Sequence, residues 1–151
     1  MFSRAPGGQR RQRAGETVAG MMANLPRILR RCPDPKRVVI MVGINNLLME
    51  DYAFLPDYER ILATLADTLP PEQITITNLP PIRVAHLAPS AVPRLNQGLL
   101  QLSQQKKTAF LDLFAAFHTE AQSVAACFTA DGVHLSDLGY AIWSACLTPS
   151  L

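Results

Sequence analysis

Apolar residues recur along the chain in two alternating patterns. Short continuous runs, rich in β-branched or aromatic residues, predict three buried strands at residues 38–42, 73–77 and 108–113. Around them, apolar residues at every third or fourth position predict amphipathic helices. The predicted helices cover residues 18–31, 57–69, 92–105, 114–126 and 136–147. Because strands and helices alternate, we expect an α/β domain with a parallel sheet and right-handed crossovers.

Prolines and loops interrupt this pattern at defined places. Pro26 lies within the first helix, which we expect to be kinked or restarted there. Long loops follow the first two strands, at residues 47–56 and 80–93. The second loop carries His86 and Ser90, and its length makes it a candidate substrate wall or lid.

The N-terminal region differs from the rest of the chain in charge. Residues 1–37 hold nine of the fourteen basic residues and two of the twelve acidic ones, so they carry +7 and the remainder carries −5. Residues 1–13 are rich in Arg and contain few apolar residues, so we expect a disordered arm followed by a folded domain at 14–148. Such an arm could contact nucleic acid or an anionic membrane. An acidic body without interleaved aromatic residues disfavours nucleic-acid binding as the function.

Length and composition limit the classes of protein to which this chain could belong. With 151 residues and 48% hydrophobic content, the chain is long enough for one domain with its own core. The three cysteines, Cys32, Cys127 and Cys146, lack the spacing of a zinc site or a disulfide framework. No apolar run has the length of a membrane span, and no secretory signal is recognisable. We therefore expect a cytoplasmic protein.

Candidate chemistry is concentrated near the C-terminus. Asp131 and His134 stand three residues apart on either side of Gly132, so a turn can hold the carboxylate against the imidazole. A carboxylate in this position fixes the tautomer of the ring and stabilises the imidazolium that forms when the base takes a proton. His134 is therefore the candidate general base, and Asp131 its orienting partner. Ser136 is the expected N-cap of the last helix.

A second candidate lies at the end of the first predicted strand. The apolar run at 38–42 is followed by Gly43, Asn45 and Asn46. A strand buried on both faces delivers polar side chains at its carboxyl end, where ligands bind in open α/β sheets.

Three segments together resemble sequence blocks of the SGNH hydrolases, also called GDSL esterases and lipases. They are Gly15-Glu16-Thr17, the stretch 41–46 with its Gly-x-Asn, and the stretch 131–135 followed by Gly139-Tyr140. They follow one another in the family's order between about residues 15 and 147. The resemblance implies a three-layer α/β/α fold with a parallel, flavodoxin-like sheet, and hydrolysis of acyl esters.

The resemblance also implies residue roles. His134 would be the base and Asp131 its partner, while the Asn45 side chain and the Gly15 main chain would each donate an N–H to the oxyanion of the tetrahedral intermediate. Reaction through an acyl-enzyme needs no metal and no organic cofactor. The expected partner is a small-molecule ester, whether an acylated sugar, a lipid or a short acyl ester.

The chain departs from the family pattern in two places. Asn46 stands where the family usually has Asp, and an amide of the same shape can still cap the turn. The Gly-Asp-Ser block that supplies the family's nucleophile is absent. Six serines are not expected to replace it, because each lies in a loop, a cap or a helix, or lacks a strand before it: Ser3, Ser90, Ser103, Ser123, Ser136 and Ser144.

The absence of the Gly-Asp-Ser block has consequences for both the sheet and the catalytic pair. An N-terminally truncated domain would leave the strand at 38–42 as an apolar sheet edge, which invites pairing with another chain. The catalytic pair would have no serine to activate. The function is then either an SGNH-type serine ester hydrolase that is inactive in this form, or a catalytically dead SGNH-like module for binding or interaction.

Overall fold

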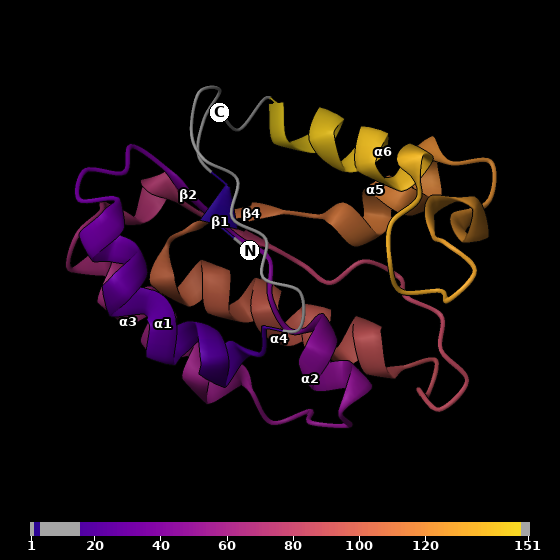
Figure 1. Cartoon of the computed structure of the whole chain (residues 1–151), viewed down its shortest axis with the longest axis horizontal. Coiled ribbons are helices and arrows are strands. Elements are labelled where there is room, and N and C mark those ends of the chain that lie inside the picture. Colours follow the sequence, from indigo (N-terminus) through magenta and orange to yellow (C-terminus); the bar gives the residue numbers. More distant parts are fainter. Residues whose placement is uncertain (1, 4–15, 149–151) are drawn as a thin grey trace.

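Three parallel strands form the centre of the computed structural model, which describes residues 2–3 and 16–148 (Figure 1). β2 (Val38–Ile40) pairs with β3 (Ile74–Thr77), and β3 pairs with β4 (Ala109–Leu111). Val38 lies opposite Ile74, and Thr75 lies opposite Ala109. The parallel sheet predicted from the three apolar runs is confirmed.

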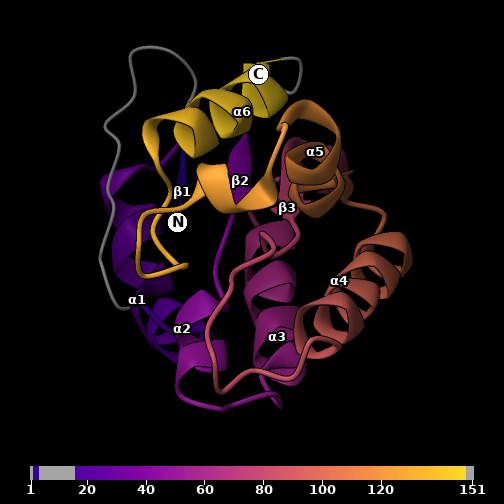
Figure 2. The same ribbon diagram turned by 90° about the vertical axis from the view of Figure 1, so that its right-hand side faces the viewer.

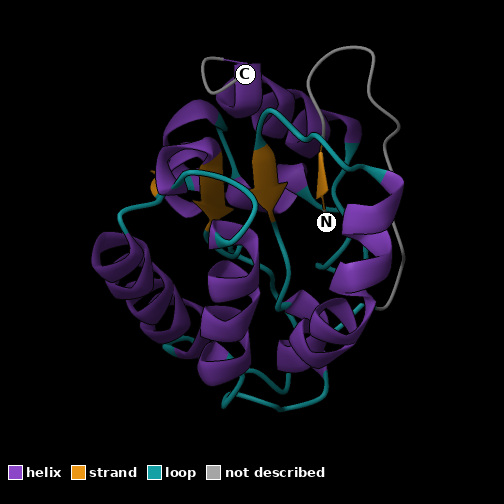
Figure 3. Cartoon of the chain, turned by 90° about the vertical axis from the view of Figure 1, so that its left-hand side faces the viewer, coloured by secondary structure: helices purple, strands orange, loops and turns teal. Residues whose placement is uncertain are grey.

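Helices cover both faces of this sheet, so the molecule has three layers (Figures 1 and 2). On one face lie α1 (Val18–Arg31), α3 (Leu55–Ala66) and α4 (Ala91–Lys106), and on the other lie α5 (Leu113–Glu120) and α6 (Asp137–Leu147). Seen from the opposite end, the short strands run between the two helical layers (Figure 3). The shorter elements are α2 (Ile44–Leu48) and the 3-10 helices η1 (Pro71–Gln73) and η2 (Val124–Cys127).

Local sequence explains where the helices next to the candidate residues begin. The Thr17 hydroxyl accepts a hydrogen bond from the Gly20 main-chain N–H (3.1 Å), and the Ser136 hydroxyl accepts one from the Gly139 N–H (3.2 Å). Both side chains satisfy a donor that the first helical turn leaves free. The N-cap role predicted for Ser136 is confirmed. α1 continues from Val18 to Arg31 through Pro26, so the predicted restart of the helix does not occur.

One continuous core holds the layers together. Leu25, Ile61 and Leu99 are buried on the side of α1, α3 and α4, and Phe117 and Trp143 are buried on the side of α5 and α6. Burial of each such side chain stabilises the fold by about 1.5–3 kcal/mol. Both layers are therefore fixed to the sheet, and the loops at its carboxyl end are carried on rigid elements.

The outer side of β2 differs from expectation. β1 (Phe2–Ser3) pairs antiparallel with β2, with Phe2 opposite Ile40 and Ser3 opposite Val39. These two residues belong to the arm expected to be disordered, and they occupy part of the edge expected to be open. An apolar strand with unpaired main-chain groups favours such pairing, here within the chain. The rest of the predicted arm lies outside the described residues, and self-association stays a prediction.

Two further boundaries differ from the pattern-based prediction. Residues 44–48 form the short helix α2, so the loop expected at 47–56 begins with the last residues of a helix. The helix expected at 114–126 ends at Glu120 and is followed by η2. Within residues 2–3 and 16–148, no helix is both long and apolar enough to cross a membrane.

Candidate active site

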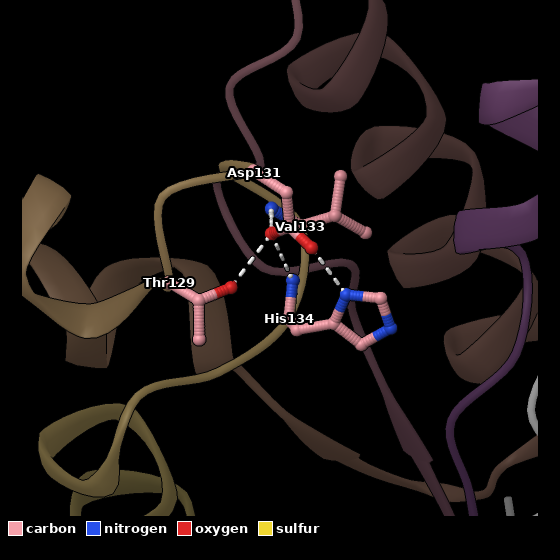
Figure 4. A network of polar contacts seen from close by, with 4 residues as sticks. All are labelled: Thr129, Asp131, Val133 and His134. Carbon is pink, nitrogen blue, oxygen red and sulfur yellow. Dashed lines mark hydrogen bonds and ion pairs between the residues drawn. The ribbon is translucent and has the colours of Figure 1, made fainter.

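Asp131 and His134 form a hydrogen-bonded pair on the loop between η2 and α6 (Figure 4). Nδ1 of His134 lies 2.5 Å from Oδ2 of Asp131. The other carboxylate oxygen, Oδ1, accepts hydrogen bonds from the Thr129 hydroxyl (2.8 Å), the Val133 N–H (2.8 Å) and the His134 N–H (3.0 Å). All four contacts lie within six residues of chain. The turn itself therefore brings together the base and partner predicted from the sequence.

The main chain around this pair forms a closed turn. The Thr129 N–H donates to the His134 carbonyl (2.8 Å), and the Gly132 N–H donates to the Thr129 carbonyl (2.9 Å). Just outside, Phe128 and Leu135 form an antiparallel bridge. Gly132 has a φ of 72°, a conformation that costs a residue with a β-carbon more than it costs glycine. The Asp-Gly sequence thus permits the reversal that faces the carboxylate toward the ring.

Hydrogen bonding to this carboxylate stabilises its charge. The bond from His134 contributes most to holding the pKa of Asp131 well below its usual range, followed by the main-chain N–H groups of Val133 and His134 and then by the Thr129 hydroxyl. Because an ionised carboxylate only accepts hydrogen bonds, Nδ1 must carry the proton and Nε2 of the neutral ring is left as the acceptor. This tautomer is the one that a general base requires.

The His134 ring is open to solvent. Its side chain is 74% exposed and that of Asp131 is 48% exposed. Among the described residues, no side chain or main-chain group hydrogen-bonds to Nε2. The proton-accepting edge of the ring is therefore accessible to a molecule from outside.

The loop at 80–93 directly contacts the turn at 129–134 that carries Asp131 and His134. The Arg83 N–H donates to the Gly132 carbonyl at 2.8 Å. The Arg83 carbonyl oxygen lies 2.1 Å from the position that a β-carbon on residue 132 would take. At the start of this loop, the buried amide of Asn96 accepts from the Leu79 N–H (2.8 Å) and donates to the Leu79 carbonyl (2.9 Å). The sequence predicts this loop as a substrate wall or lid, which stays a prediction. Its bond to Gly132 and the bonds between Asn96 and Leu79 were not predicted from the sequence.

Asn45 lies on α2, beyond the carboxyl end of β2 (Figure 1). Its Nδ2 donates to the Glu16 carbonyl at 3.0 Å, so it contacts the Gly-Glu-Thr segment singled out in the sequence. A side-chain amide has two N–H donors, and this bond uses one of them. Gly15, the other predicted oxyanion donor, lies outside the described residues. The shared role of Asn45 and Gly15 stays a prediction.

Asn46 supports the same region from within. Its side chain is buried, with Oδ1 accepting from the Val18 N–H (2.9 Å) and Nδ2 donating to Oδ2 of Asp51 (2.7 Å). An aspartate here could make the first bond but not the second, because a carboxylate has no donor. The amide at residue 46 therefore joins the start of α1 to Asp51, and its expected role as a cap of its own turn stays a prediction.

None of the described serine side chains hydrogen-bonds to His134. The Ser136 hydroxyl donates to the Ala126 carbonyl (2.6 Å), and the buried Ser103 hydroxyl donates to the Thr108 carbonyl (3.0 Å). Ser90, Ser123 and Ser144 are exposed, in the loop before α4, before η2 and on α6 respectively. In residues 2–3 and 16–148, no group of three His, Cys, Asp or Glu side chains is placed to hold a metal ion.

A family model places the chain among known proteins. Residues 3–142 match the GDSL-like lipase/acylhydrolase family. The chain belongs to this family. No relative was found among curated proteins.

Solved GDSL-type structures share the fold. A lipase/acylhydrolase from Enterococcus faecalis superposes with a TM-score of 0.74 at 19% identity, over 88% of this chain and 69% of its own. An acetylxylan esterase from Geobacillus stearothermophilus gives 0.69 at 22% identity, over 90% and 68%. A third is an α/β hydrolase from the metagenome of Lake Arreo, Spain, at 0.72 and 16%, over 90% and 68%. These similarities establish the three-layer α/β fold expected from the sequence.

Three solved catalytic mutants of the acetylxylan esterase each carry one replacement by alanine. The replaced residue is an aspartate, a histidine three positions after it, or a serine.

Proposed function

We propose that this GDSL-family chain carries the general-base part of a serine ester hydrolase. The observation that carries the proposal is the 2.5 Å contact between Nδ1 of His134 and the Asp131 carboxylate, with Nε2 open to solvent. Nε2 takes the proton of the attacking hydroxyl and then returns it to the leaving alcohol, while Asp131 stabilises the imidazolium between these steps. The spacing of this pair equals that of the aspartate and histidine replaced in the catalytic mutants of the acetylxylan esterase.

In this proposal the oxyanion site is formed by Asn45 and Gly15. The bond from Asn45 to the Glu16 carbonyl supports it, because it fixes the amide next to the segment that contains Gly15. Donors held by a helix and a neighbouring main chain stabilise negative charge on the tetrahedral intermediate without rearranging. The acyl group then leaves the enzyme by reaction with water.

The substrate is a small-molecule ester. Acylated sugars, lipids and short acyl esters all fit this chemistry, and the proposed site residues do not distinguish among these substrates. No described serine contacts His134, so we expect the 151-residue chain alone to hydrolyse none of them. The proposal therefore needs a nucleophile that is not among the described serines.

The test compares hydrolysis of p-nitrophenyl acetate and butyrate by three proteins. They are the 151-residue chain, a form extended upstream to the next in-frame start, and the extended form with His134→Ala. We expect activity in the extended form alone. The control is Arg94→Gln in the extended form, which changes an exposed side chain on α4 that the proposal does not use and should leave activity unchanged.

A fluorophosphonate probe, which reacts covalently with activated serines, should label the extended form and not the 151-residue chain. Hydrolysis by the short chain that disappears on His134→Ala would show that the chain has its own nucleophile. Silence of the extended form would contradict the hydrolase proposal.

The second candidate is a binding module of the same fold without catalysis. It is favoured by the exposed His134 ring, whose accepting nitrogen meets no described side chain. The two proposals differ in outcome, since a binding module remains inactive in the extended form and still retains ester or sugar ligands.

A further inference from the structure

An open cavity of about 690 Å³ is lined in large part by the loop at 80–93. Its walls come from that loop, the first turn of α4, α5 and η2. Figure 2 shows α4 and α5 on opposite faces of the sheet, so the lining of the cavity comes from both helical layers. Neither Asp131 nor His134 lines it, and no residue of the loop at 47–56 does. Its described lining therefore includes no residue of the proposed catalytic pair.

The walls of this cavity are mostly apolar. Leu87, Val92, Phe114 and Val124 are buried or half-buried and face it from four different elements. Pockets of about 300–1,000 Å³ with such walls accept small organic molecules in proteins. The size and lining therefore suit an aliphatic or aromatic group.

Two basic side chains supply its polar part. Arg83 is exposed, and within the described residues its guanidinium has no hydrogen bond and no ion pair. Nδ1 of His118 lies 2.8 Å from the Phe114 carbonyl, so this nitrogen carries a proton and Nε2 is left for another partner. No Asp or Glu is among the residues that line the cavity. An uncompensated cation next to an apolar cavity favours an anionic group on the ligand.

We propose that this cavity binds an amphipathic carboxylate, that is, a carboxylic acid with an apolar body of medium length. The apolar part lies among Leu87, Val92 and Phe114, and the carboxylate lies against the guanidinium of Arg83, which can donate two parallel hydrogen bonds to it. Ester hydrolysis releases acids of this class, but binding here requires no catalysis.

Arg83 also connects the cavity to the catalytic turn. Arg83 is among the residues that line the cavity, and its main-chain N–H donates to the carbonyl of Gly132, the residue after Asp131. A ligand that holds the side chain of Arg83 therefore restrains the main chain that contacts the turn. We expect ligand binding to change the NMR shifts of Gly132 and His134 although neither touches the ligand.

The test is titration of the 151-residue chain with octanoate at pH 7, by calorimetry and NMR, beside octanol and acetate. Octanol has the chain without the charge and acetate the charge without the chain. We expect octanoate to bind at least about tenfold more tightly than either, because both parts of the cavity contribute. Equal binding of octanol, or no binding of octanoate at millimolar concentration, would overturn the proposal.

Variants locate the ligand. Arg83→Gln should weaken octanoate binding about tenfold, whereas the control Arg94→Gln, an exposed arginine of α4 outside the cavity, should not. Ala88→Trp places a large ring in the cavity from an exposed position and should abolish binding, beside the exposed control Ala63→Trp on α3. Binding that survives Ala88→Trp and disappears on His134→Ala would place the ligand at the catalytic turn instead. Because binding is measured without turnover, its failure is distinct from failure of the hydrolase proposal.

Discussion

The Arg83 carbonyl oxygen occupies space that any side chain on residue 132 would need. It lies 2.1 Å from the ideal β-carbon position at Gly132, and the Arg83 N–H donates to the Gly132 carbonyl. Two loops that follow different elements are thereby joined through their main chains. The position of the turn at 129–134 relative to the loop at 80–93 depends on this contact.

Gly132→Ala should separate the two loops. The new methyl group meets main-chain atoms that cannot rotate away, and the positive φ at residue 132 adds strain. We expect a loss of about 2–4 kcal/mol in the free energy of unfolding, measured by urea denaturation. The control is Gly98→Ala within α4. Its new β-carbon would meet only the flexible end of the Leu55 side chain. If both substitutions lower the free energy of unfolding by the same small amount, the contact between Arg83 and Gly132 does not hold the two loops together.

Thr129→Val should raise the pKa of Asp131 toward its usual range. The substitution removes the hydroxyl that donates to Oδ1 and keeps the size and the main-chain bonds of the turn. The change should be partial, because the bonds from His134 and Val133 remain. NMR titration of the Asp131 carboxyl carbon measures it directly. The control Thr119→Val, whose hydroxyl donates to carbonyls of its own helix, should leave the titration unchanged.

The lowered pKa of Asp131 also predicts how stability depends on pH. A carboxyl group whose pKa is lower in the folded state than in the unfolded state stabilises the fold above the unfolded value, about 3.9, and loses this contribution as the pH falls through the folded value. The difference in unfolding free energy between the native chain and Asp131→Asn should therefore be largest above about pH 5 and shrink on acidification. A difference that grows toward acidic pH would contradict this assignment.

Sequence patterns predicted the elements that are determined by residues close together in the chain. Alternation of apolar runs with helical periodicity gave the strands and the long helices, and the Ser136 cap and the Asp131–His134 pair followed from residues a few positions apart. α2 was missed because two consecutive asparagines after Gly43 are typical of a turn. Nothing in the sequence marks the contact between Arg83 and Gly132, since it joins main-chain atoms of distant segments. The pairing of β1 was missed for the same reason.

Asn46→Asp tests why an amide stands where the family usually has a carboxylate. The aspartate could still accept from the Val18 N–H, but it would place a second carboxylate in the position that now donates to Asp51 at 2.7 Å. Burial and the neighbouring charge should raise the pKa of the new carboxyl group in the folded state. We expect a loss of about 1–3 kcal/mol in unfolding free energy at pH 7.

The stability contribution of the new carboxyl group in Asn46→Asp should depend on pH in the opposite direction to that of Asp131. A group with a raised folded pKa stabilises the fold below its unfolded value and loses this contribution as the pH rises through the folded value, so the deficit of Asn46→Asp should disappear near pH 4. The double variant Asn46→Asp with Asp51→Asn restores a donor opposite the new carboxylate and should recover most of the stability at pH 7. If the double variant is as unstable as the single one, charge repulsion is not the cause, and loss of packing around the buried residue 46 is.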